Sequence, residues 1–208
     1  MMTLYFTPNT CALASLITLE EIGTGFKLER ISFPKEEQKS ARFLKVNPKA
    51  RVPALETDHG ILTETPAILA YLAQTHPDSN LAPASDPFRF ARMQEFNSYL
   101  CSTLHVAHAH RMRGHRWVDD AAAIEAMQRK VPQSVGESFA YVEQQALAGP
   151  YVLGDQYSVA DAYLFTLSRW MKNDGLNPAD YPKVQAHSAL VGARPAVIKA
   201  VQTEGDAS

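Results

Sequence analysis

Strand-like and helix-like patterns are unevenly divided along this chain, and that division constrains its fold more than any other feature. Short apolar or alternating runs typical of strands occur only in the first 78 of the 208 residues. Residues 79–87 are rich in Pro, Ser and Asp, a composition typical of a linker between domains. From Phe88 onward the pattern is helical. We therefore expect an α/β domain over residues 1–78, a linker over 79–87 and an all-helical domain over 88–208.

The first 78 residues are predicted to follow the order β-α-β-α-β-β-α. Residues that end strands and helices, such as Pro, Gly, Asn and Asp, separate the apolar runs. The segments, in order, are Thr3–Phe6 (strand), Cys11–Ile22 (helix), Phe26–Phe33 (strand), a short helix ending near Asn47-Pro48, Val52–Glu56 and Gly60–Thr63 (a hairpin), and a helix opened by Glu64-Thr65-Pro66 with Ile68, Leu69, Tyr71 and Leu72 buried.

The second part is predicted to be a helical bundle. Ser158 and Asp161 fit a capping box with Asp in place of Glu or Gln. Pro132 and Gly136 are expected to interrupt the helix that contains them. We expect helices over residues 88–110, 121–147 and 162–171, and two shorter ones after Pro182 and Pro195.

Composition narrows the class of protein. The sequence is 46% hydrophobic and 20% charged, which is typical of a globular protein rather than a disordered or fibrous one. Its formal net charge of -2 gives no global reason to expect nucleic acid or anionic lipid as a partner. No run approaches the roughly 18 to 20 apolar residues that a membrane span needs, and residues 1–5 lack the features of a signal peptide. We expect a cytoplasmic protein that binds neither nucleic acid nor membrane.

Cys11 is the first candidate for chemistry, because it lies between the first predicted strand and the first predicted helix. The N–H groups and dipole at a helix N-terminus favour a thiolate, so we expect its pKa to lie below about 8.5. A buried structural thiol is the alternative, since free cysteines are often buried. The chain has no Cys-x-x-Cys motif, and Cys101 is its only other cysteine, so a second reacting thiol would have to come from a ligand.

Two short segments have the features of a site for a peptide-like ligand. Val52-Pro53 begins a predicted strand after a loop, where a cis bond would turn the preceding backbone groups outward and a trans bond would give an ordinary strand edge. Glu64 and Thr65 lie at the start of a helix, where N–H groups and a hydroxyl bind a carboxylate and the Glu64 carboxylate binds an ammonium. Simple capping of the helix by Thr65 is the alternative.

Four of the seven histidines and three arginines fall within residues 105–116. His105 and His108 share a helix face, but His110 points away and no nearby Cys or carboxylate completes a zinc set, so we expect no metal site. The arginines have no interleaved aromatic ladder of the kind that binds nucleic acid. The segment is better explained as a basic helix end, favoured by the helix dipole, that borders a cleft. Its other members are His115, Arg111, Arg113 and Arg116.

Taken together, these motifs resemble the glutathione transferase superfamily, most closely its bacterial beta class. The resemblance covers nearly the whole chain and implies a thioredoxin-like N-terminal domain followed by an all-helical C-terminal domain. It also implies that the Val52-Pro53 bond is cis. The motifs that carry it are Leu4-Tyr5-Phe6-x-Pro8-x-x-Cys11, Asn47–Leu55, Leu62-Thr63-Glu64-Thr65, Leu104-His105 and Ser158–Phe165.

The resemblance implies a role for each residue of a glutathione site. Cys11 would face the sulfur of glutathione, through a hydrogen bond or a mixed disulfide, and His105 would reach the same site from the helical domain. Val52, followed by Pro53, would pair through its backbone with the cysteinyl part of glutathione. The other implied contacts are Glu64 and Thr65 with the γ-glutamyl end, Lys35 near the glycyl carboxylate, Arg51 at the rim of the cleft, and Ser98 with the partner's site in a homodimer.

Several positions depart from the pattern of the class. Ala12 and Val106 stand where the class often has Ser and Lys, so a hydroxyl and a cation are missing near the sulfur. Stabilisation of the glutathione thiolate then depends on Cys11 and His105. Ser98 stands where relatives carry Asn, although Asn97 adjoins it.

The resemblance implies an enzyme of detoxification that ionises bound glutathione and conjugates it to small hydrophobic electrophiles, with no metal. Lowering the pKa of the glutathione thiol by two units corresponds to about 2.7 kcal/mol. Two alternatives stay open: a glutathione-dependent thiol–disulfide oxidoreductase acting through Cys11, and a non-catalytic ligand-binding module with the same fold. Aromatic residues that could line the electrophile site, unless they are core, are Tyr99, Trp117, Tyr163 and Trp170.

Overall fold

The N-terminal part of the chain forms a four-stranded mixed sheet in the predicted order of segments. The computed structural model describes residues 1–206. The sheet has the strand order β2-β1-β3-β4, with β1 parallel to β2 and antiparallel to β3, and β3 antiparallel to β4. The strands are β1 (Met2–Phe6), β2 (Phe26–Arg30), β3 (Ala54–Thr57) and β4 (Gly60–Thr63).

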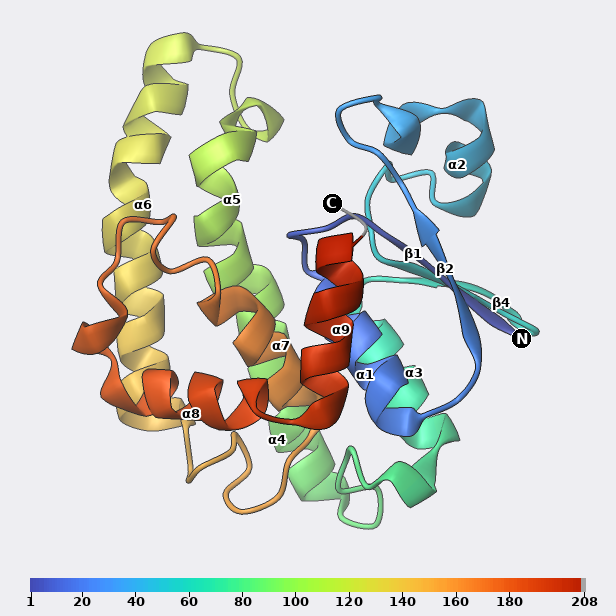
Figure 1. Ribbon diagram of the computed structural model, residues 1–208. Coiled ribbons are helices and arrows are strands. Elements are labelled where there is room, and N and C mark those ends of the chain that lie inside the picture. The colour runs from blue at the N-terminus through green and yellow to red at the C-terminus, as the bar shows by residue number, and fades with distance from the viewer. Residues whose placement is uncertain (207–208) are drawn as a thin grey trace.

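Helices cover both faces of this sheet, which gives the thioredoxin-like domain that the resemblance implied. Figure 1 shows α1 (Ala12–Ile22) and α3 (Thr65–Thr75) on one side and α2 (Ala41–Val46) on the other. Leu4, Ile17 and Leu55 are fully buried between these layers. Tyr71 was predicted to be buried on α3 but is only partly so. The Val52-Pro53 bond is cis, as the resemblance implied.

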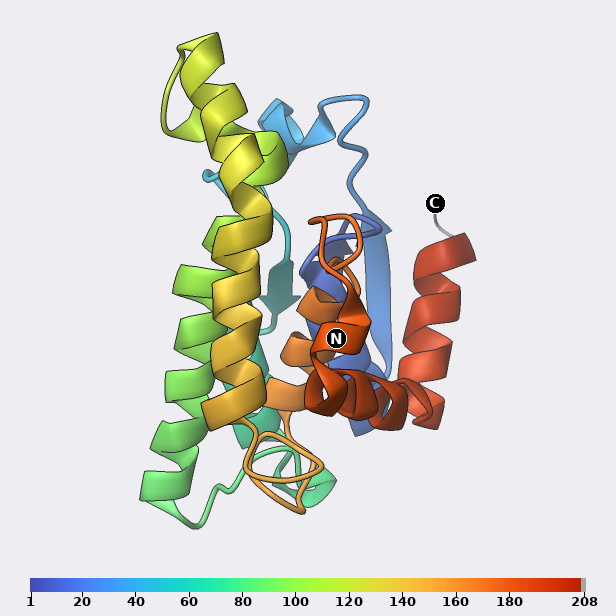
Figure 2. The same cartoon turned by 90° about the vertical axis from the view of Figure 1, so that its left-hand side faces the viewer.

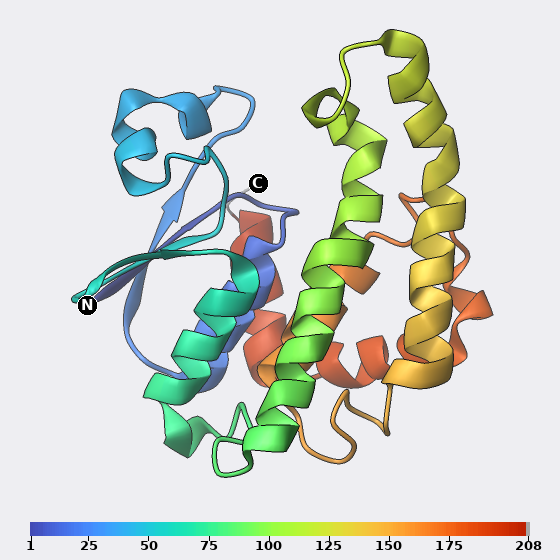
Figure 3. The ribbon, with the colours of Figure 1, turned by 180° about the vertical axis from the view of Figure 1, so that it is seen from behind.

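The rest of the described chain is a bundle of helices. Figure 3 shows α4 (Pro87–Tyr99) and α5 (His105–Arg113) joined into one rod beside the sheet domain. A π-helical turn, η3 (Leu100–Leu104), connects them. The helix α7 (Val159–Ser168) forms the centre, because all ten of its residues are buried. The other elements are η1 (Glu37–Lys39), η2 (Pro77–Ser79), η4 (Gly114–Arg116), α6 (Ala121–Tyr141), η5 (Val142–Ala146), η6 (Pro178–Asp180), α8 (Pro182–Gly192) and α9 (Pro195–Asp206).

The predicted interruption of α6 at Pro132 and Gly136 is wrong. The helix is continuous through both residues, and Figure 2 shows it as a long rod along one side of the molecule. Val131, Val135 and Phe139 are buried on one face of α6, so tertiary packing outweighs the hydrogen bond that proline removes. The predicted helix over 162–171 is also shifted, since α7 spans 159–168.

The two ends of the chain pack against each other. The last helix, α9, lies along α1 (Figure 1). Arg194, just before α9, donates two hydrogen bonds to Glu21 of α1, with N···O distances of 2.6 and 2.9 Å. These contacts hold the helix that begins beside Cys11 against the helical domain. Within residues 1–206, no helix is long and apolar enough to cross a membrane.

Candidate functional site

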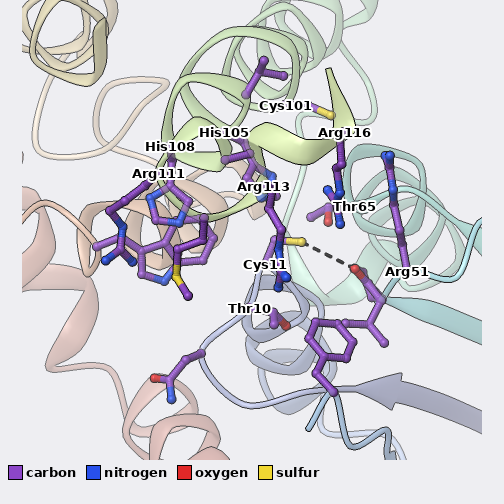
Figure 4. A pocket seen from close by; sticks show the side chains of 18 of the residues that line it. Thr10, Cys11, Arg51, Thr65, Cys101, His105, His108, Arg111, Arg113 and Arg116 are labelled. Atoms are coloured by element: carbon purple, nitrogen blue, oxygen red, sulfur yellow. Dashed lines mark hydrogen bonds between the residues drawn. The ribbon is translucent and has the colours of Figure 1, made fainter. Parts of the chain in front are cut away.

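A cavity of about 460 Å³ lies between the sheet domain and α5 (Figure 4). One wall comes from the loop before α1, the loop before β3 and the start of α3, and the other from α5, η4 and the end of α7. Seven of the predicted site residues line it, although they are spread over more than ninety positions of the sequence. These are Cys11, Arg51, Val52, Pro53, Glu64, Thr65 and His105.

Cys11 lies at the N-cap position of α1, as the sequence predicted, but its thiol is not activated. Its side chain is only 8% exposed, and its Sγ donates to the backbone oxygen of Val52 at 3.7 Å. Burial raises its pKa to about 11, and Thr65 only partly opposes this change. The expectation of a pKa below about 8.5 is therefore wrong, because the cost of burying the thiolate exceeds the benefit of the helix terminus. At neutral pH Cys11 is a neutral thiol and a hydrogen-bond donor.

Asn47, which the sequence placed at the end of a helix and at the start of a family motif but not in the site, shapes the loop that carries Val52. It is 1% exposed, and its Nδ2 donates to the Arg51 backbone oxygen at 2.6 Å. Its Oδ1 accepts from the Lys49 backbone nitrogen at 3.1 Å. A buried amide that satisfies both sides of a loop fixes its path, and here it positions the backbone of Val52 beside the thiol.

Glu64 and Thr65 lie at the mouth of α3, where the sequence predicted a site for an amino-acid end. Glu64 is the N-cap but makes no capping bond with its side chain, and its φ of 72° is unusual for a residue other than glycine. Its carboxylate contacts Lys49 Nζ. Thr65 is buried and occupies the first position inside the helix, so it does not serve as the cap. Both polar side chains are thus free of a capping role and border the cavity.

His105 enters the cavity from α5. Its ring lies 5.4 Å from that of Trp170, and its Nδ1 is 3.4 Å from the Tyr163 hydroxyl. Burial, followed by electrostatic interaction with His108 and Arg116, lowers its pKa to about 4. The imidazole is therefore neutral at neutral pH and acts through hydrogen bonds rather than charge.

The basic segment borders this cavity, as predicted. His108 stacks on Trp170 with a centroid distance of 4.2 Å, and its Nδ1 is 2.7 Å from Asp174 Oδ2. Arg111 Nε lies 3.2 Å from the other oxygen of Asp174. Asp174 was missed by the sequence analysis, because it lies 66 positions from His108 and belongs to no motif. Among residues 1–206, no group of three His, Cys, Asp or Glu side chains is placed to hold a metal ion.

Comparison with known proteins identifies the fold. Residues 1–74 match the model of the glutathione S-transferase N-terminal domain, and residues 109–190 match that of its C-terminal domain. The chain is 33% identical to glutathione S-transferase GstA of Escherichia coli O157:H7 over 207 residues, which covers 98% of this chain and 99% of that protein. This chain belongs to the glutathione S-transferase family.

Solved structures of glutathione transferases agree with this assignment. A glutathione transferase homologue from Sulfitobacter, with bound glutathione, has a TM-score of 0.94 and 43% identity, covering 99% of this chain and 98% of that one. BphK, a bacterial glutathione transferase solved as a ternary complex, has a TM-score of 0.86 and 34% identity, covering 98% and 99%. The family, its two-domain fold and its enzymatic class are therefore those that the sequence motifs indicated.

Two residues that the sequence predicted for the sites of this transferase, Lys35 and Tyr99, lie outside the cavity. Lys35 is exposed and does not line it. Ser98, predicted to contact the site of a partner subunit, is exposed on α4, and that contact stays a prediction. Tyr99 packs against Tyr141 at 4.7 Å between ring centroids and donates its hydroxyl to the Ser138 backbone oxygen at 3.1 Å. It is therefore a packing residue and not part of the cavity. The other aromatic residues predicted to line the electrophile site do border it, namely Trp117, Tyr163 and Trp170.

Proposed function

We propose that this chain binds reduced glutathione in the cavity, stabilises its thiolate and conjugates it to a small hydrophobic electrophile. The observation that carries the proposal is the position of the Cys11 thiol, 3.7 Å from the Val52 backbone oxygen in a cavity that Glu64 and Thr65 also line. A peptide-like ligand that pairs with Val52 and places its amino-acid end at Glu64 and Thr65 brings its own sulfur toward Cys11. The bound glutathione in the similar Sulfitobacter structure supports this placement.

In this mechanism the protein supplies hydrogen bonds to sulfur rather than a charge. Cys11, a neutral thiol because its pKa is raised to about 11, donates its S–H to the glutathione thiolate instead of to Val52. His105, uncharged because its pKa is lowered to about 4, supplies a second polar contact from α5. Donors fixed before the ligand arrives stabilise the developing thiolate without reorganisation. Glutathione loses its thiol proton to solvent, and its sulfur then attacks the electrophile.

The same features disfavour thiol–disulfide exchange through Cys11. The attacking species in such exchange is a thiolate. A buried thiol whose pKa is raised to about 11 is almost fully protonated at neutral pH. The transferase reaction needs only the donor function of this thiol, and Cys11 already donates a hydrogen bond.

The rest of the proposal concerns the context of the enzyme. We propose a cytoplasmic, bacterial homodimer that acts in detoxification without a metal and without nucleic-acid or membrane partners. Ser98 is exposed on α4, whereas Asn97 is fully buried, so Ser98 is the residue available to a partner subunit. The glutathione-binding domain would comprise residues 1–78, the linker 79–87 and the electrophile-binding domain 88–208, of which Ala207 and Ser208 lie outside the described residues.

The test is a titration of glutathione into the protein at pH 6.5, followed by the ultraviolet absorbance of the thiolate. Free glutathione is almost wholly protonated at this pH, so a saturable signal reports a thiolate formed in the site. S-methylglutathione, which cannot ionise, should compete without giving a signal. Turnover of 1-chloro-2,4-dinitrobenzene then tests the transfer step. Binding by calorimetry without a thiolate signal or turnover would favour a non-catalytic binding module instead.

The homodimer has its own test. Sedimentation equilibrium should give twice the mass of one chain, and Ser98→Arg should shift the population toward one chain if Ser98 lies at the interface. A single-chain mass for the unaltered protein would contradict the dimer and leave the glutathione site unaffected.

A further inference from the structure

Positive charge is concentrated on one part of the cavity wall. Five arginines border the cavity, whereas Glu64 is its only carboxylate within the described chain. The whole sequence carries a formal charge of -2, so this concentration is local and is not a property of the surface as a whole. The arginines are Arg51, Arg111, Arg113, Arg116 and Arg169.

Two of these arginines already have carboxylate partners. Arg169 Nη1 lies 2.8 Å from the buried Glu204, and Arg111 Nε lies 3.2 Å from the buried Asp174. Glu64, the cavity's own carboxylate, is in contact with Lys49. The acidic groups nearest to the cavity are therefore occupied by other cations.

Arg51, Arg113 and Arg116 have no carboxylate partner among residues 1–206. Figure 4 shows the three side chains around the same space as Cys11. Burial, and then the charges of Arg51 and Arg113, lower the pKa of Arg116. Three guanidinium groups facing one space repel one another, and an anion bound among them removes this repulsion.

An apolar surface adjoins these guanidinium groups. The guanidinium carbon of Arg113 lies 5.7 Å from the centroid of the Phe33 ring. Trp117, directly after Arg116, and Trp170 border the same cavity. The site thus presents aromatic faces for an apolar body and planar donors that match a carboxylate.

We propose that the electrophile conjugated by this enzyme is a small aromatic or unsaturated compound that carries a carboxylate, bound by Arg113 and Arg116. This inference rests on the proposed function and narrows its substrate class. Arg51 comes from the loop beside Val52, on the wall proposed for glutathione, and can serve a carboxylate of glutathione itself. Arg113 and Arg116 come from the end of α5 and from η4, on the wall of the helical domain.

A matched pair of electrophiles tests this proposal, namely 4-chloro-3,5-dinitrobenzoate and 4-chloro-3,5-dinitrobenzamide. In both, the glutathione thiolate forms a C–S bond at the chlorinated carbon, the C–Cl bond breaks, and chloride leaves with the electron pair. The pair differs in charge but little in shape. Dividing each kcat/KM by the rate constant of the uncatalysed reaction removes the difference in intrinsic reactivity.

We expect the unaltered enzyme to prefer the carboxylate by about tenfold after this normalisation, since each charge-assisted hydrogen bond contributes roughly that much. The preference should fall toward one in Arg113→Gln and Arg116→Gln, and it should fall as sodium chloride is raised. Arg129→Gln is the matched control, because Arg129 is exposed on α6 outside the cavity and pairs with Glu125 of the same helix. Its preference should equal that of the unaltered enzyme.

The contrary outcomes are distinct. Turnover of both compounds with no preference for the carboxylate, at low salt, would overturn this inference and leave the proposed function standing. A higher KM for glutathione in Arg113→Gln and Arg116→Gln, with the preference unchanged, would assign these arginines to glutathione and also overturn it. Failure to turn over either compound, together with no thiolate signal, would contradict the proposed function itself. The salt dependence needs no variant, so it remains decisive if a substitution disturbs folding.

Discussion

The carboxylate of Glu204, in the last helix, accepts a hydrogen bond from the backbone nitrogen of Asn9 at 2.8 Å, across 195 positions of the sequence. Asn9 lies in the turn that leads into Cys11, and its φ of 59° is in the left-handed region. The other oxygen of Glu204 accepts from Arg169 Nη1 at 2.8 Å. Glu204 is 3% exposed, so one buried carboxylate joins α9, the end of α7 and the loop that carries the candidate thiol.

Glu204→Gln should therefore weaken the binding of glutathione, although Glu204 does not itself line the cavity. The amide can still accept from Asn9, but it leaves Arg169 without a charge partner in a partly buried position. We expect a loss of about 1–3 kcal/mol in the free energy of unfolding and a several-fold increase in the KM for glutathione. Urea unfolding and steady-state kinetics measure these effects. Glu125→Gln, on the exposed face of α6, is the control and should change neither quantity.

The sequence predicted the parts of this structure that depend on local signals. The element order of the first 78 residues follows from turn residues and apolar runs, and the capping box at Ser158 follows from a four-residue pattern. Seven of the nine candidate site residues line one cavity. The order of their motifs along the chain indicated a known fold, and that fold brings them together.

What the sequence did not predict depends on packing between distant segments. Cys11 was placed correctly at the start of α1, but its pKa shift has the opposite direction because the folded chain buries the thiol beside Val52 and Thr65. Asp174 and Glu204 are buried carboxylates whose partners lie 66 and 195 positions away. The continuity of α6 through Pro132 likewise depends on what its buried face contacts.

Cys11→Ser and Cys11→Ala separate donation from nucleophilic attack. A serine hydroxyl can donate a hydrogen bond to the glutathione sulfur but cannot form a mixed disulfide. We therefore expect Cys11→Ser to keep most of the transferase activity, and Cys11→Ala to raise the pKa of bound glutathione by about one unit, the effect of one lost hydrogen bond to an anion. Thiolate absorbance as a function of pH gives this pKa. Loss of activity in both variants alike would instead favour a covalent role for Cys11.

His105 should make the stability of the protein depend on pH. Its pKa is about 4 in the folded chain, because of burial and nearby positive charge, and near 6.5 when unfolded. The unfolded chain therefore binds the proton first as pH falls, so stability is complete above pH 6.5 and decreases between about pH 6.5 and 4. The loss amounts to about 3 kcal/mol.

Urea unfolding of the glutathione-free protein at pH 7.5 and 4.5 measures this loss. His105→Gln should show a smaller loss between the two pH values by about that amount. His115→Gln, an exposed histidine outside the cavity, should behave like the unaltered protein. Equal losses in all three proteins would show that His105 is not the group responsible.

Asp161 should be the most costly single substitution in the helical domain, because it is the acceptor for four groups. Its Oδ2 accepts from the backbone nitrogen and the hydroxyl of Ser158 at 2.7 and 3.0 Å. Its Oδ1 accepts from the Val152 backbone nitrogen at 2.7 Å and lies 3.0 Å from His187 Nε2. Asp161 is fully buried, so none of these donors can turn to water instead.

Asp161→Asn preserves the shape of the side chain but directs an NH2 group at groups that themselves donate hydrogen bonds. We therefore expect it to lower the free energy of unfolding by about 3–5 kcal/mol. Asp120→Asn provides a matched comparison. Asp120 is an exposed N-cap of α6 that accepts from the Ala123 backbone nitrogen at 2.7 Å, and Asn caps a helix about as well as Asp. Urea unfolding should therefore show a change of no more than about 0.5 kcal/mol for Asp120→Asn. A similarly small change for Asp161→Asn would mean that the network around α7 rearranges to satisfy the amide.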